Sequence, residues 1–111
     1  MSLMCQWQFL VTHDGQRDEI SARVSAVMDA LLDLESVDAR LTNSAVSLDL
    51  TSMTVTVELS VAGIDYEESI AHALAAIRTA IHAAGGSTPD WPSDGPSPSM
   101  FEPQDFVAVP A

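Results

Sequence analysis

A stretch in the middle of the chain alternates strictly between apolar and polar residues. The even-numbered positions 46–50 and the odd-numbered positions 53–61 are apolar, and polar residues separate them. A period of two on both sides of a short break predicts an antiparallel hairpin with one apolar face. A two-residue turn at Thr51-Ser52 fits this pattern and would place Leu48 opposite Val55.

A second alternating stretch, Met4–Thr12, predicts the first strand of the sheet. Leu10 interrupts the alternation, because it shares the side of Gln6 and Gln8. The opposite side carries large apolar residues and is expected to face the core. These residues are Cys5, Trp7, Phe9 and Val11.

Two further segments have the period of an amphipathic helix. In the first, Gln16–Ser36, apolar residues recur at steps of four and three. They are Ile20, Val24, Val27, Leu31 and Leu34. The second helix is predicted to begin at an Asp65 cap with Glu68 three residues later, a variant of the capping box. Gly85-Gly86 is expected to end it.

The composition changes after Gly86. Residues 87–103 contain five prolines among Ser, Asp and Gly and are predicted to form an extended linker. Apolar residues return in the tail 104–111, which we expect to dock as an added strand on this sheet. Docking on another copy, or a loose tail, are the alternatives. The order β-α-β-β-α over residues 1–86, with a C-terminal strand, is typical of an α+β, ferredoxin-like split βαβ sandwich with both helices on one face of an antiparallel sheet.

The charge balance excludes several functions. The chain of 111 residues has the length of one domain and holds 16 acidic residues against four arginines, with no lysine and a net charge of −12. Such a charge repels nucleic acids and anionic membrane surfaces and favours solubility, a basic partner or a divalent cation. There is no apolar run of membrane-spanning length and no leader pattern, so we expect a cytoplasmic protein. Cys5 is the single cysteine and is expected to be a buried, inert thiol.

The first strand–helix turn is one candidate ligand site. It holds His13, Asp14, Gly15 and Gln16, with Asp14 also a plausible helix cap. ACT-like regulatory domains share this order of elements and bind amino acids at this turn, so a small-molecule sensor is the alternative function. The simpler interpretation of His13 is a solvated loop residue.

The other polar residues do not suggest catalysis. His72 and His82 are ten residues apart on one helix, about 15 Å along its axis, too far to share a metal ion. His82, in the last turn, is interpreted as a cation that stabilises the helix C-terminus. Asp49 is predicted opposite Thr54 rather than opposite Glu58, so the two carboxylates do not form an acid–base pair. No catalytic sequence motif is present, and we expect no enzyme activity, cofactor or metal.

The sheet face away from the helices is therefore the main functional candidate. It is predicted to be polar, without the aromatic and basic residues that RNA-binding domains of this architecture use. We expect a non-enzymatic domain that self-associates as a homodimer, or binds another protein, through this face and the apolar tail. The predicted interface comprises Gln6, Gln8, Leu10, Thr54, Thr56, Glu58, Phe106 and Val107.

One segment resembles a known group of proteins. The second predicted helix and its exit, Ala76–Gly86 followed by Thr88-Pro89-Asp90-Trp91, are similar to part of a family of small uncharacterised proteins from actinobacteria. The resemblance covers about 15 residues of the chain. It implies an actinobacterial source and no particular activity.

Overall fold

Six elements alternate along the chain in the order β-α-β-β-α-β. A computed structural model of the protein describes residues 2–13, 17–89 and 99–110. The elements are β1 (Ser2–His13), α1 (Arg17–Val37), β2 (Leu41–Asp49), β3 (Thr54–Ala62), α2 (Tyr66–Ala83) and β4 (Ser99–Pro110).

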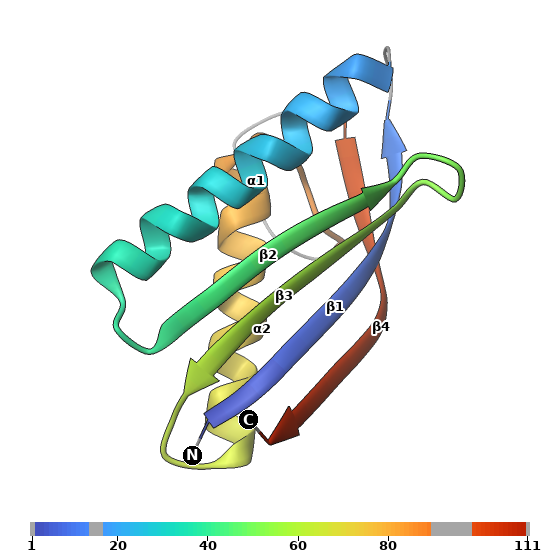
Figure 1. Ribbon diagram of the computed structural model, residues 1–111. Coiled ribbons are helices and arrows are strands. Elements are labelled where there is room, and N and C mark those ends of the chain that lie inside the picture. The colour runs from blue at the N-terminus through green and yellow to red at the C-terminus, as the bar shows by residue number, and fades with distance from the viewer. Residues whose placement is uncertain (1, 14–16, 90–98, 111) are drawn as a thin grey trace.

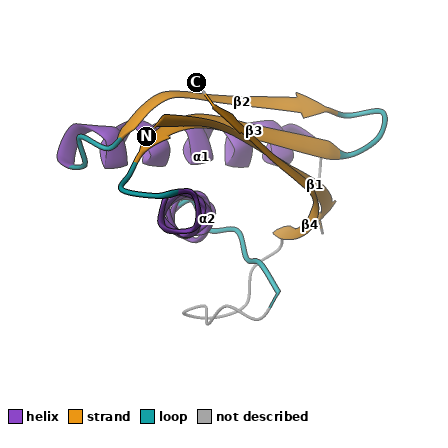
Figure 2. Ribbon diagram, turned by 90° about the horizontal axis from the view of Figure 1, so that it is seen from below, coloured by secondary structure: helices purple, strands orange, loops and turns teal. Residues whose placement is uncertain are grey.

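The strands form one antiparallel sheet in the order β2-β3-β1-β4 (Figure 1). Both helices lie against the same face of this sheet, as the view from below shows (Figure 2). The α+β class is thus confirmed, and the arrangement is consistent with a ferredoxin-like sandwich. Neither helix of the described residues lies on the opposite face, and we call it the helix-free face.

The predicted hairpin register is confirmed. Leu48 pairs with Val55, and Asp49 pairs with Thr54. The predicted two-residue turn is wrong, because residues 50–53 all lie between the strands. The side chain of Asp49 accepts a hydrogen bond from the Thr51 amide at 2.9 Å, and Met53 has a φ of 54°. The longer loop follows from the lack of an Asn-Gly or similar pair that a tight primed turn requires.

Helix α2 begins and ends as predicted. Asp65 accepts a hydrogen bond from the Glu68 amide at 2.8 Å, and the Glu68 carboxylate accepts one from the Ile64 amide at 3.2 Å. At the other end Gly85 has a φ of +89°, and Gly86 donates its amide to Ile81 at 2.9 Å. These bonds satisfy backbone groups that a helix otherwise leaves unpaired.

The C-terminal segment forms β4 and pairs with β1 of the same chain. The docked strand expected at 104–111 is present, but it begins at Ser99, so the expected linker 87–103 overlaps it. Ser87 also forms a bridge to Met100. Pro103 lies inside the strand, and the register to β1 shifts between Trp7 and Phe9. A proline and a bulge are both tolerated at the edge of a sheet.

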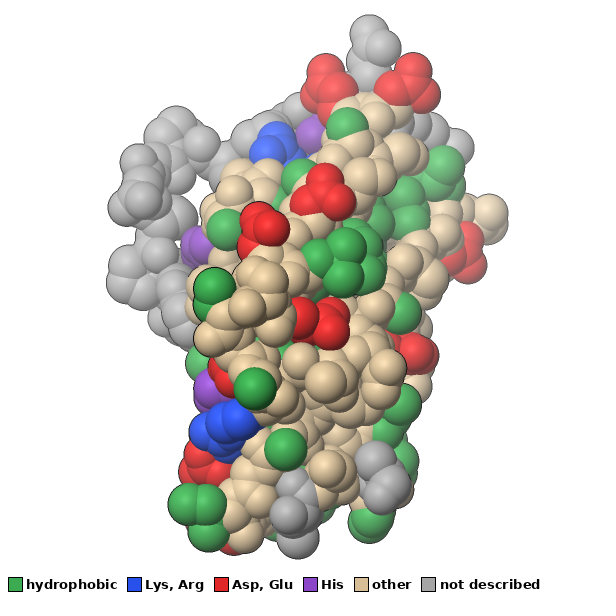
Figure 3. Space-filling model, turned by 60° about the vertical axis from the view of Figure 1, so that its left-hand side comes forward, with side chains coloured by type: hydrophobic (Ala, Val, Ile, Leu, Met, Phe, Trp, Pro, Cys, Tyr) green, Lys and Arg blue, Asp and Glu red, His purple; other side chains and the backbone are tan. Residues whose placement is uncertain are grey.

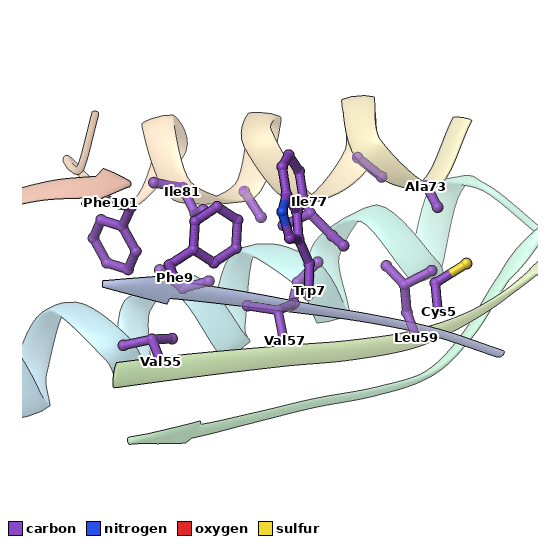
Figure 4. Close-up of a cluster of buried hydrophobic side chains, with 14 of the residues drawn as sticks. Cys5, Trp7, Phe9, Val55, Val57, Leu59, Ala73, Ile77, Ile81 and Phe101 are labelled. Atoms are coloured by element: carbon purple, nitrogen blue, oxygen red, sulfur yellow. The ribbon is translucent and has the colours of Figure 1, made fainter. Parts of the chain in front are cut away.

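Aromatic and branched side chains fill the space between the sheet and the helices (Figure 4). The ring centroids of Trp7 and Phe9 are 4.6 Å apart, and Phe101 meets Phe9 edge-on at 6.1 Å. The ring centroids of Trp7 and Phe106 are 5.9 Å apart, and the two rings meet edge-on. Cys5 is fully buried as expected, and this burial raises the pKa of its thiol. Strand β4 is therefore an integral part of the core.

Candidate functional site

The side chain of His13 is fully buried, so the expectation of a solvated loop residue is wrong. Its Nδ1 lies 2.7 Å from the hydroxyl of Ser99, at the start of β4. Its Nε2 lies 3.2 Å from a carboxylate oxygen of Glu19, in α1. Asp14, Gly15 and Gln16, the other members of the predicted ligand site, lie outside the described residues. The imidazole connects three elements and has both nitrogens engaged.

The contacts of His13 with Ser99 and Glu19 resemble a hydrolase triad, but the serine is buried and the carboxylate is exposed, the reverse of a working triad. Ser99, which would be the nucleophile, is fully buried, whereas the Glu19 side chain is 59% exposed. A nucleophile must reach its substrate, and the third residue of a triad is normally the shielded one. The contacts of His13 are thus suited to holding β1, β4 and α1 together, not to attacking a substrate.

A second polar cluster connects the start of β2 with α2. His72 Nε2 lies 2.6 Å from Asp38, and Arg40 forms an ion pair with Glu68. The backbone amide of Arg40, and next to it His72, hold the pKa of Asp38 below its usual range. The guanidinium of Arg40 likewise lowers the pKa of Glu68. Asp38 and Arg40 lie between α1 and β2, whereas Glu68 and His72 lie in α2, so the cluster fixes α2 against the start of β2.

His82 lies in the last turn of α2, as predicted. Its Nε2 lies 2.8 Å from the Thr88 hydroxyl and 3.2 Å from the Thr88 amide nitrogen. Arg23 of α1 also reaches this helix end, where its Nη1 donates to the Ala84 carbonyl at 2.6 Å. The sequence did not indicate this contact, because it joins residues 61 positions apart.

Most, but not all, of the predicted interface residues lie on the helix-free face. In the sheet register Gln6 pairs with Glu58, Gln8 with Thr56 and Leu10 with Thr54, so these six predicted interface residues share one face. Val107 pairs with Gln6 and belongs to the same face. Phe106 does not belong to it, because it pairs with Trp7 and contacts that ring on the helix-covered side. Seven of the eight predicted interface residues therefore lie on the helix-free face, and Phe106, predicted as part of the apolar tail, lies on the helix-covered side.

The β1–β4 half of the helix-free face carries exposed apolar residues beside the polar Gln6, Gln8 and Glu102. We call its four exposed large apolar residues the apolar strip: Met4, Leu10, Val107 and Val109, with 37%, 41%, 52% and 46% of their surface exposed. Met4 and Val109 are direct cross-strand neighbours. The sequence pattern missed Met4 and Val109, since their adjacency depends on the pairing of β4 with β1.

Two other surface features are a groove between the helices and an acidic flank. A groove of about 330 Å³ between the helices is lined mainly by small and apolar residues, among them Ala30, Leu34, Val37 and Ala83. Acidic side chains are spread over this flank of the molecule and basic ones are few (Figure 3). Within residues 2–13, 17–89 and 99–110 no three potential ligands are grouped to hold a metal ion.

The helices of the described chain include none with the length and apolarity needed to cross a membrane. Comparison of the chain with protein-family models, curated proteins and solved structures finds no significant match. The resemblance to actinobacterial proteins therefore stays a prediction. The function has to be argued from the geometry of the chain itself.

Proposed function

We propose that this chain is a non-catalytic, ferredoxin-like interaction domain that self-associates through the β4 side of its sheet. The observation that carries the proposal is the apolar strip, above all Val107 and Val109, about half exposed in a strand at the sheet edge. Neighbouring exposed apolar side chains of this kind mark protein contacts more often than isolated ones do. The order β-α-β-β-α-β supports the ferredoxin-like part of the proposal.

The distribution of polar residues agrees with this function. Contacts of His13, His72 and His82 are to groups within the protein, which suits positioning roles. Of the carboxylates on the helix-free face, Asp49 and Glu58 lie on β2 and β3, and Glu102 lies on β4 opposite Leu10, at one end of the strip. An apolar contact area with charge at its rim is the usual composition of an interface.

The alternative function is a small-molecule sensor that binds at the first strand–helix turn. It has less support, because the His13 ring is buried and engaged with Ser99 and Glu19. A thermal-shift screen of amino acids and nucleotides separates the two functions. A ligand at 100 times its Kd would add about 2.7 kcal/mol to the free energy of unfolding.

The direct test of self-association is the mass in solution. Light scattering at increasing micromolar concentrations should approach twice the monomer mass of 11.8 kDa. Val107→Asp should return the monomer mass, because it places a charge in the strip. Val37→Asp is the matched control, since Val37 is 82% exposed at the end of α1, outside β4 and the apolar strip, and should leave the dimer intact. A monomer mass for the unmodified chain at every concentration would refute the proposal.

A further inference from the structure

Strand β4 lies at the edge of the sheet, yet its last part has the composition of an inner strand. Residues 106–110 are all apolar, and they alternate between the two faces. Phe106 and Ala108 are half-buried on the helix-covered side, whereas Val107 and Val109 are exposed on the helix-free face. Edge strands of stable monomers usually carry charges that prevent pairing, and residues 106–110 carry none.

The opposite edge of the sheet is different. Strand β2 has polar residues at Thr42, Asn43 and Ser47 and ends at Asp49. Its register to β3 is interrupted between Thr42 and Ala45, and Asn43 has a φ of 57°. Bulges and polar side chains of this kind protect an edge against pairing. The two edges thus differ at residues 106–110, which lie beyond the bulge, Pro103 and Asp105 of β4, and this stretch is the one suited to a contact (Figure 1).

We propose that residues 106–110 of β4 pair antiparallel with the same residues of a second copy, with Ala108 on the two-fold axis. The two four-stranded sheets would then form one continuous sheet. This inference rests on the proposed function and specifies its partner strand and register. A strand that pairs antiparallel with its own copy produces a closed, isologous dimer.

The register follows from the side chains. Directly opposite residues of an antiparallel pair point to the same face, so residues of equal parity must meet. With Ala108 on the axis, Val107 meets Val109 of the second copy and Phe106 meets Pro110. With Val107 on the axis, the Asp105 carboxylate would lie opposite a valine. Only the first register keeps all paired positions apolar, and the proline then falls at the end of the paired segment, where a missing amide matters least.

Charge favours edge pairing over stacking of the two helix-free faces. Each copy has a net charge of −12, and stacked faces would bring Asp49 and Glu58 of both copies into one interface. Like charges removed from water in this way repel strongly. Edge pairing leaves these carboxylates in water, and only the remaining long-range repulsion opposes the dimer. Salt screens that repulsion, so the dimer should become tighter as ionic strength rises.

Cysteine cross-linking tests the register. Ala108→Cys should form an intermolecular disulfide on oxidation, because directly opposite Cα atoms are about 4.5–5.5 Å apart, within disulfide range. Leu10→Cys is the matched control on the helix-free face, 41% exposed, and should not cross-link. Cys5 is fully buried and does not interfere. Salt-dependent light scattering of the unmodified chain is a second readout that needs no substitution.

The outcomes separate the two proposals. Cross-linking at 108 with a dimer mass that grows with salt supports the edge pairing. A dimer that cross-links at Leu10→Cys and not at Ala108→Cys overturns the edge pairing and leaves self-association standing, through the helix-free face. A monomer mass at all concentrations and salt levels overturns both.

Discussion

Replacement of Phe101 by alanine tests whether β4 is part of the core. The Phe101 side chain is fully buried and contacts the ring of Phe9 edge-on. It also lies against Gly86, since a Cβ on that glycine would be only 2.9 Å from the Phe101 ring. A side chain held on several sides leaves a cavity that its neighbours fill poorly.

The expected cost is large compared with the stability of a small domain. Phe→Ala at a buried site destabilises by about 3–5 kcal/mol, and domains of this size are stable by about 5–15 kcal/mol. We therefore expect Phe101→Ala to lower the free energy of unfolding by about 4 kcal/mol. With a urea m-value of about 1–3 kcal/mol/M, the unfolding midpoint should fall by at least ~1.3 M.

The assay is urea unfolding followed by far-UV circular dichroism in dilute solution, where association adds nothing. Phe106→Ala is the matched control, because the same side chain is removed from the same strand at a half-buried position. Phe106→Ala should lower the free energy of unfolding clearly less than Phe101→Ala does. A Phe101→Ala variant destabilised by less than about 1 kcal/mol, or less than Phe106→Ala, would show that β4 is not docked on the core as described.

Three further predictions concern other parts of the chain. Asp38→Asn should lower the free energy of unfolding at neutral pH. Its difference in this free energy from the unmodified chain should shrink as the pH falls from the ordinary Asp pKa of 3.8 through the lower pKa of folded Asp38. Urea titrations that show the same difference at every pH would contradict this. Gly86→Ala should cost about 1–3 kcal/mol in thermal or urea unfolding, because its Cβ would lie 2.9 Å from Ile81; an unchanged stability would refute the close packing. Cys5 should react with a thiol reagent only when the protein unfolds, since it is buried and its pKa is raised; rapid labelling of the native protein would disprove that burial.

Local patterns predicted much of the fold. Alternation gave the pairing of Leu48 with Val55, and the cap at Asp65 and the stop at Gly85 placed α2. These features depend on residues close together in the chain, where periodicity and capping chemistry apply. The start of β4 was missed because Pro103 argues against a strand unless its place at the sheet edge is already known.

The buried polar contacts and the proposed contact surface were harder to predict, because their residues meet only through long-range pairing. His13 contacts Ser99, 86 positions away, and no local pattern marks this contact. The apolar strip likewise requires that Met4 and Val109 be neighbours, which follows only from the pairing of β1 with β4. Phe106 was predicted as part of the apolar tail without a face, and its pairing with Trp7 beyond the register shift assigns it to the helix-covered side.

The edge pairing of β4 is tested by amide hydrogen exchange as a function of protein concentration. Every second amide of an antiparallel edge strand already bonds the neighbouring strand, so edge pairing would bury only those amides of residues 106–109 that point away from β1. The core strands β1 and β3 are paired on both sides in either state. Exchange of the outward-pointing amides in residues 106–109 should slow as the concentration rises, while exchange in residues 55–61 of β3 should stay the same. Outward-pointing amides that exchange equally fast at all concentrations would contradict edge pairing.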